Sequence, residues 1–162
     1  MQEGERVKPS FNAMWSAYPT PLVTQGQLYD ELGIGALTGD INYANTCGIR
    51  MSYTLAKAGH PLMVGGLKIQ KGPHKGARLE PGMKRLAAHL ETLWGKPEEY
   101  ADGKAAKAGI GQRRGVIAFF YAPGSGMAQG HIDLVEPAAK GLECAGTCYF
   151  TPTTKVSFWP LD

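Results

Sequence analysis

The sequence predicts an α+β protein, with helices in the first half of the chain and strands in the second. Apolar residues recur at helical spacing in 11–18, 45–59 and 83–94, whereas short apolar or alternating runs occupy 115–121 and 130–136. This order favours helices packed on one face of an antiparallel sheet. The 22 glycines among 162 residues indicate many turns and close backbone approaches rather than a helical bundle.

Length and composition are those of a soluble globular protein, and we expect residues 1–162 to form a single domain. Apolar residues make up 43% of the chain and charged residues 19%. The apolar runs are too short for a transmembrane helix, so no membrane insertion is expected. Residues 1–6 lack the features of a secretory signal. The net charge of +3 suits an anionic partner. Basic residues do not interleave with aromatic ones, so nucleic acid is not expected as a partner.

The first predicted helix spans 11–18, where Ser10 can cap the start and Pro19 ends it. A turn-rich segment follows as far as residue 44, with one helical turn predicted at 28–32.

The helix predicted at 45–59 carries a cysteine in its first turn. Asn45 or Thr46 can cap it, and Gly59 supplies a left-handed end. Cys47 lies where free backbone N–H groups and the positive end of the helix dipole favour the reactive thiolate. The alternative is that Cys47 is a small buried hydrophobe. The helix presents one apolar face, formed by Cys47, Met51, Leu55 and Ala58.

The next segment, 60–82, is predicted to be irregular, with a short strand at 67–70. It leads into an amphipathic helix at 83–94, which Gly95 ends. His89 lies off the apolar face of that helix, so we expect it at the solvent-exposed surface.

The second half of the chain contains the predicted strands. Residues 115–121 form a continuous apolar run typical of a buried strand, and 130–136 alternate as a strand with one buried face does. A glycine-rich turn joins them. Two more strands are predicted at 148–150 and 155–159.

The three cysteines divide into a close pair and a distant single residue. A local disulfide between Cys144 and Cys148, with Cys47 free, is the simplest pairing. Such a disulfide implies an oxidising compartment, yet the chain shows no export signal. Either the pair is reduced, or the protein leaves the cell by a route that needs no cleavable signal.

Cys47 needs a base to act as a nucleophile, and His131 is the best candidate. Because side chains two apart on a strand point the same way, Asp133 shares a face with His131 and can orient it. His131 would take the thiol proton and the thiolate would attack a carbonyl; the imidazolium would then protonate the leaving amine. Backbone N–H groups at the helix start, including that of Cys47, would hold the oxyanion. The alternative for His131 is a purely structural strand histidine.

A zinc site is the competing interpretation of these residues. Structural zinc sites usually combine two close pairs of Cys or His ligands, and this sequence offers one. We therefore expect no metal and no cofactor. The four candidate ligands are Cys144, Cys148, His131 and Cys47.

Two motifs together resemble a known family. Residues 45–53, followed by Leu55 and Gly59, resemble the nucleophile helix of the type VI secretion amidase effectors, family four. Residues 130–134 resemble their histidine strand. The opening Pro9-Ser-Phe-Asn-x-x-Trp15, the late cysteine pair and the closing Phe158-Trp159-Pro160 also fit.

The resemblance implies a papain-like fold related to the NlpC-type peptidases. It also implies an antibacterial toxin, which the type VI apparatus injects without a signal peptide into the periplasm of a rival cell. There these effectors cut peptidoglycan stem peptides between D-glutamate and meso-diaminopimelate, at a γ-linked amide. The periplasm would oxidise Cys144 and Cys148, and a cognate immunity protein would protect the producer.

Carried over residue by residue, Cys47 matches the family nucleophile and His131 the family base. The family has an aspartate between the two late cysteines, whereas residues 145–147 of this sequence include no acid. Asp133 is therefore our predicted third catalytic residue. A Cys–His dyad oriented by a backbone carbonyl is the alternative. Two other functions stay open at this point: a non-catalytic wall-binding module, and a thiol acyltransferase that uses the same Cys–His pair.

Overall fold

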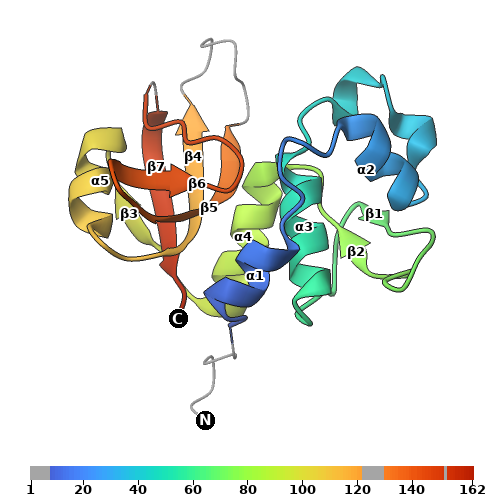
Figure 1. Ribbon diagram of the computed structural model, residues 1–162, viewed down its shortest axis with the longest axis horizontal. Helices are drawn as coiled ribbons and strands as arrows, with labels where there is room; N and C mark the ends of the chain where they lie inside the picture. The colour runs from blue at the N-terminus through green and yellow to red at the C-terminus, as the bar shows by residue number, and fades with distance from the viewer. Residues whose placement is uncertain (1–7, 122–129, 152) are drawn as a thin grey trace.

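The computed structural model describes residues 8–121, 130–151 and 153–162, and its elements follow the predicted order of helices and then strands (Figure 1). The turn predicted between the first two strands, within 122–129, lies outside the described residues. The first half contains α1 (Phe11–Ala17), α2 (Gln25–Glu31), the 3₁₀ turns η1 (Gly35–Leu37) and η2 (Ile41–Tyr43), α3 (Cys47–Lys57), β1 (Leu67–Lys68), β2 (Arg78–Leu79) and α4 (Met83–Trp94). The second half contains β3 (Glu98–Tyr100), α5 (Gly103–Ile110), β4 (Gly115–Tyr121), β5 (His131–Ala138), β6 (Gly141–Cys144) and β7 (Thr153–Pro160).

The main sheet has five antiparallel strands in the order β3-β7-β4-β5-β6. In the register of β4 and β5, Phe119 is opposite His131 and Ile117 is opposite Asp133. Helices α3 and α4 lie on one side of the sheet, and α5 lies on the other (Figure 1). The sheet is therefore covered on both faces, which explains why β4 is apolar along its whole length.

Helix α3 is the centre of the helical half. Its residues 47–56 are all buried, so the single apolar face predicted from spacing is only part of its packing. Met51 and Leu55 join a core cluster with α1, α4 and the sheet. On another side of α3, Ile49 and Tyr53 join a second cluster with α2, β1 and β2. A helix buried between two cores holds its first residue in a fixed place.

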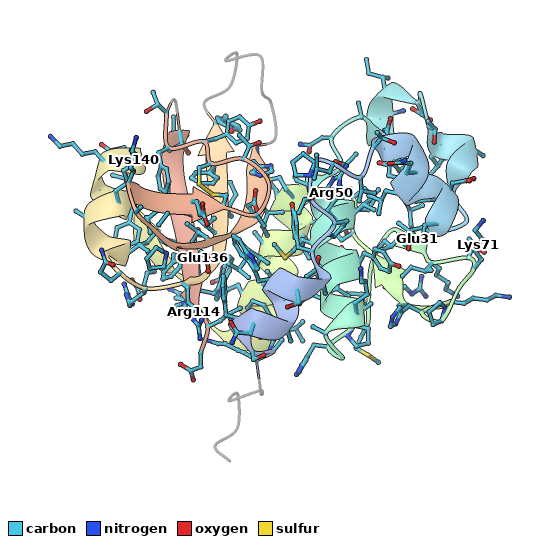
Figure 2. All side chains as sticks on the ribbon, in the orientation of Figure 1. Glu31, Arg50, Lys71, Arg114, Glu136 and Lys140 are labelled. Atoms are coloured by element: carbon cyan, nitrogen blue, oxygen red, sulfur yellow. A yellow bond between two sulfur atoms is a disulfide. The ribbon has the colours of Figure 1, made fainter. Side chains whose placement is uncertain are left out.

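Arg50 is a charged residue within this buried helix, with 9% of its surface exposed. Its guanidinium points from α3 toward the segment before α2 (Figure 2). There it donates hydrogen bonds of 2.8–3.0 Å to the carbonyl oxygens of Pro19, Thr20 and Val23. These bonds give hydrogen-bond partners both to the buried guanidinium and to the backbone carbonyl groups of the irregular segment.

Most of the residues that the sequence predicts to cap or end a helix do so in the structure. Ser10 caps α1 by accepting the N–H of Ala13, as predicted. Gly59 follows α3 with a left-handed φ of +85°. Thr46 directly precedes α3, but its side chain caps no N–H and instead accepts a hydrogen bond from Arg50 Nε at 2.8 Å.

Several sequence-based predictions were wrong. Residues 148–150 form no strand, because Tyr149 and Phe150 pack their rings against Phe119 instead of pairing their backbones. Strands β2, β3 and β6 and helix α5 were missed. Helix α5 buries only Gly103, Ala106 and Ile110, so its apolar pattern is weak. His89 is half-buried rather than solvated, with Nε2 3.4 Å from Glu80 Oε1.

None of the helices in the described ranges is long and apolar enough to span a membrane.

Candidate active site

Cys47 is the first residue of α3, and 3% of its surface is exposed. The helix begins here because Asn45 Oδ1 accepts the N–H of Cys47 at 3.2 Å, which replaces a side-chain cap by Thr46. The thiol lies at the positive end of the helix dipole, where an anionic sulfur is favoured. Because Asn45 already takes the Cys47 N–H, this predicted oxyanion donor is engaged in the structure.

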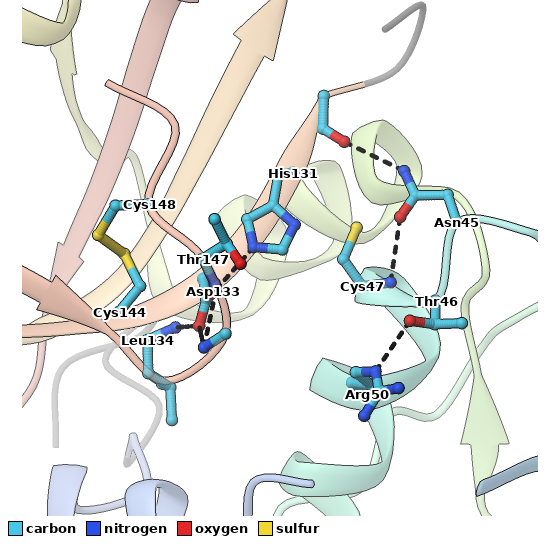
Figure 3. A network of polar contacts seen from close by, with 12 residues as sticks. Asn45, Thr46, Cys47, Arg50, His131, Asp133, Leu134, Cys144, Thr147 and Cys148 are labelled. Atoms are coloured by element: carbon cyan, nitrogen blue, oxygen red, sulfur yellow. Dashed lines mark hydrogen bonds and ion pairs between the residues drawn. A yellow bond between two sulfur atoms is a disulfide. The ribbon is translucent and has the colours of Figure 1, made fainter. Parts of the chain in front are cut away.

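His131 is the first residue of β5, and its ring lies beside the Cys47 thiol (Figure 3). The ring stacks on Phe119 at 6.3 Å between centroids and meets Tyr149 edge-on at 5.0 Å. Gly130 precedes it with a φ of +107°, and a Cβ there would lie 2.1 Å from the Phe119 carbonyl oxygen. Only glycine fits that position, so Gly130 lets the strand begin where the histidine is needed.

Asp133 orients the imidazole. Its Oδ2 lies 2.6 Å from His131 Nε2, and the aspartate is fully buried. The carboxylate also accepts the backbone N–H groups of Leu134, Gly146 and Thr147 at 2.7–3.1 Å. These hydrogen bonds from the backbone take the place of water around the buried Asp133 carboxylate and fix its position. Because Nε2 is engaged with Asp133, Nδ1 is the nitrogen left for the thiol.

The pKa of His131 reflects opposing influences. Burial lowers it, but the hydrogen bonds and charges of Asp133 and Cys47 outweigh burial and raise it from 6.5 to about 9. At neutral pH the imidazole is therefore protonated, so it can pair with a thiolate and later donate a proton.

Asn45 joins the two halves of the site. While its Oδ1 accepts from Cys47, its Nδ2 donates to the carbonyl oxygen of Gly130 at 3.1 Å (Figure 3). One side chain thus connects the start of the cysteine helix to the residue before the histidine. The sequence indicated Asn45 only as a helix cap, because a contact across 85 positions leaves no local pattern.

Cys47 and His131 open onto one cavity of about 340 Å³. Its walls come from the segment before α2, the start of α3 and the loop 145–149, and they include Tyr18, Arg50 and Tyr149. Burial raises the pKa of Tyr18 well above its usual value, and the neighbouring Asp133 and Cys47 raise it further. The sequence did not identify Tyr18 as a site residue, since aromatic residues at such spacings more often form cores, and it placed Tyr149 in a predicted strand.

The structure brings all three predicted site residues together, and it forms the disulfide between Cys144 and Cys148. Two of the three thiols in the alternative zinc set, those of Cys144 and Cys148, are consumed by that bond. Within the described ranges, no group of three or more potential metal ligands is found.

The α+β structure, with a cysteine at the start of a buried helix beside a histidine on an antiparallel sheet, has the papain-like, NlpC-type fold of the solved structures described below. Comparison with known families extends this assignment. The model of the type VI secretion system amidase effector protein 4 family, Tae4, matches residues 43–159, a span that includes Cys47, Asp133 and His131. The chain belongs to this family, and it is therefore an antibacterial hydrolase of the type VI amidase effectors.

Solved structures share the fold. The Tae4–Tai4 effector–immunity complex from Enterobacter cloacae contains a chain 24% identical, with a TM-score of 0.78 over 96% of this chain and 100% of that one. The Salmonella typhimurium effector Tae4, bound to the Enterobacter cloacae immunity protein, is 22% identical, with a TM-score of 0.76 over the same shares. The Enterobacter cloacae effector alone is 24% identical, with a TM-score of 0.75 over 98% and 99%. No curated protein matches the chain in sequence.

Proposed function

We propose that this protein is a cysteine amidase that hydrolyses the γ-D-glutamyl–meso-diaminopimelate bond of peptidoglycan stem peptides in the periplasm of a target cell. The observation that carries the proposal is the convergence of Cys47, His131 and Asp133 at one cavity. Membership of an amidase family favours hydrolysis over the non-catalytic wall-binding alternative.

In this proposal Cys47 is the nucleophile and His131 is the general acid and base. The Cys47 thiolate attacks the γ-carbonyl carbon of D-glutamate, and the C–N bond then breaks as the imidazolium gives its proton to the diaminopimelate amine. The now neutral His131 takes a proton from water, whose oxygen attacks the thioester carbonyl. The C–S bond then breaks, which releases the γ-carboxyl group of D-glutamate and restores the Cys47 thiolate beside the protonated imidazole. Asp133 holds the imidazole in place throughout.

The disulfide supports the proposed compartment. Cys144 and Cys148 are joined while Cys47 stays free, as the oxidising periplasm would leave them. Delivery by the type VI apparatus would take the protein there without a cleavable signal.

A cognate immunity protein is the proposed partner. Structures of similar effectors are complexes with the immunity protein Tai4, so we propose that a protein of this kind covers the cavity in the producing cell. The producing cell would need such protection, because its own peptidoglycan would contain the same bond.

The decisive experiment compares wild-type protein with Cys47→Ala on Gram-negative peptidoglycan, with mass analysis of the released muropeptides. We expect wild type to release products cut between D-glutamate and diaminopimelate, and the variant to release none. Full cleavage by a folded Cys47→Ala protein would contradict the assignment of the nucleophile. Products joined to an added amine instead of water would indicate an acyltransferase.

A further inference from the structure

A second cavity, of about 410 Å³, lies next to the proposed catalytic cavity. Asn45 lines both cavities, and its side chain accepts the N–H of Cys47, so the two cavities share the residue that lies beside the nucleophile. The second cavity extends between η2 and the start of α4. Its lining includes Tyr43, Gly66, Pro81, Gly82 and Arg85; we call it the Arg85 cavity.

Arg85 is the one charged residue that lines this cavity in the described part of the chain. Its Nε donates to Glu80 Oε2 at 3.2 Å, while 73% of its side chain stays exposed. Glu80 is itself fixed, because it is 3% exposed and also accepts the N–H of Gly82 at 3.0 Å. His89 Nε2 lies 3.4 Å from its other oxygen. A buried carboxylate therefore anchors an exposed guanidinium at the cavity wall.

This anchoring leaves the two terminal NH₂ groups of Arg85 for a ligand. Within the described ranges, the Arg85 side chain makes one hydrogen bond, which Nε donates to Glu80. Two parallel N–H groups on a planar cation match the two oxygens of a carboxylate. Among the described residues that line the cavity there is no carboxylate, so Glu80, which contacts Arg85 from outside this lining, is the acid that pairs with it.

We propose that the Arg85 cavity is a substrate subsite, in which Arg85 binds a free carboxylate next to the scissile amide. The proposal rests on the proposed function, because it takes the substrate to be a stem peptide. Two carboxylates flank the γ-D-glutamyl–diaminopimelate bond: the α-carboxylate of D-glutamate and a carboxylate of diaminopimelate. Both carboxylates are joined to the scissile amide through short chains of carbon–carbon bonds, and two cavities that share the wall residue Asn45 suit a substrate of that size.

The test uses three synthetic stem peptides that differ in one group. The first carries both free carboxylates, the second has the D-glutamate α-carboxylate as a carboxamide, and the third has the diaminopimelate side-chain carboxylate as a carboxamide. We expect Arg85→Gln to lower kcat/KM about ten-fold on the first peptide, mainly through KM, because a charge-assisted hydrogen bond is lost. On one of the carboxamides, the variant should equal wild type, and that peptide identifies the carboxylate bound.

Comparing substrates within one variant separates binding from folding, because any loss of folded protein lowers activity on all three peptides alike. Lys84→Gln is the matched control, since Lys84 is an exposed cation on the same helix that does not line the cavity. Arg85→Lys keeps the charge without the planar fork and should fall between wild type and Arg85→Gln.

Equal losses on all three peptides, or an equal loss in Lys84→Gln, would overturn the subsite. Cleavage of none of the peptides by wild type would count against the proposed function instead. The subsite is then tested by binding alone: Cys47→Ala protein should bind the peptide with both carboxylates about ten-fold more tightly than one of the carboxamides. Equal affinity for all three would overturn it.

Discussion

At the scale of single residues, His131 is the side chain whose chemistry depends most on its neighbours. A buried imidazole would ordinarily have a lowered pKa, yet Asp133 and Cys47 raise the pKa of His131 to about 9. A raised pKa means that the protonated form is stabilised by the fold. That stabilisation is complete below pH 6.5 and is lost as the pH rises through 9.

We predict that Asp133→Asn lowers the pKa of His131 and moves the alkaline limb of the activity–pH profile to lower pH. The asparagine carries no negative charge, so it stabilises the imidazolium less than the carboxylate at 2.6 Å does. Wild-type activity should decline as the pH rises through about 9, because the general acid is then lost. The measurement is kcat/KM against pH for both proteins. An unchanged alkaline limb in Asp133→Asn would favour the Cys–His dyad.

At the scale of elements, the short loop closed by Cys144 and Cys148 supports the catalytic strand. Gly146 and Thr147, inside this loop, donate both of their N–H groups to Asp133. The family's aspartate between the two cysteines is absent here, and the loop backbone instead holds an aspartate on β5. The disulfide thus acts on His131 through Asp133.

We predict that opening this disulfide lowers kcat while leaving the protein folded. A bond that closes so short a loop contributes on the order of 2 kcal/mol to stability, and its loss frees the two N–H donors of Asp133. Activity should fall about ten-fold on reduction with dithiothreitol.

The double variant Cys144→Ser, Cys148→Ser is the control for that experiment. It should be as slow without reductant as reduced wild type, and dithiothreitol should not slow it further. If reductant slowed both proteins equally, it would be acting elsewhere, and the disulfide would have no role in orienting Asp133.

At the scale of the whole molecule, α3 connects the helical half to the sheet. Met51 is fully buried in the cluster that contains residues of α1, α4, β4, β5 and β7. Trp159 closes the same cluster and donates its indole N–H to the Gly95 carbonyl oxygen at 3.0 Å. A core shared in this way makes the stability of the two halves interdependent.

We predict that Met51→Ala destabilises the protein by about 2–5 kcal/mol, through lost burial and the cavity left behind. Because the core is shared, far-UV circular dichroism and tryptophan fluorescence should report one transition, shifted to lower temperature for both probes. Met63→Ala is the control, since Met63 is 77% exposed, and it should shift the transition little. Two separate transitions would contradict our expectation of a single domain.

The sequence by itself determined the class of the fold and most of its elements. Helical periodicity located α1, α3 and α4, a continuous apolar run located β4, alternation located β5, and a short strand pattern located β7. Period-two alternation put Asp133 on the face of His131, and in the structure Asp133 Oδ2 lies 2.6 Å from His131 Nε2. Helix α5 and strand β6 escaped detection because they are short and only partly buried.

The tertiary structure alone decided how the site is assembled. Asn45 meets Gly130 across 85 positions, and the loop after β6 supplies the N–H groups that Asp133 accepts. No local pattern encodes such contacts, because backbone amides are the same in every residue and acquire a role only through position. The Arg85 cavity likewise exists only because α4 begins beside η2. Sequence patterns record which face a residue buries, whereas the partner it meets depends on how the chain packs.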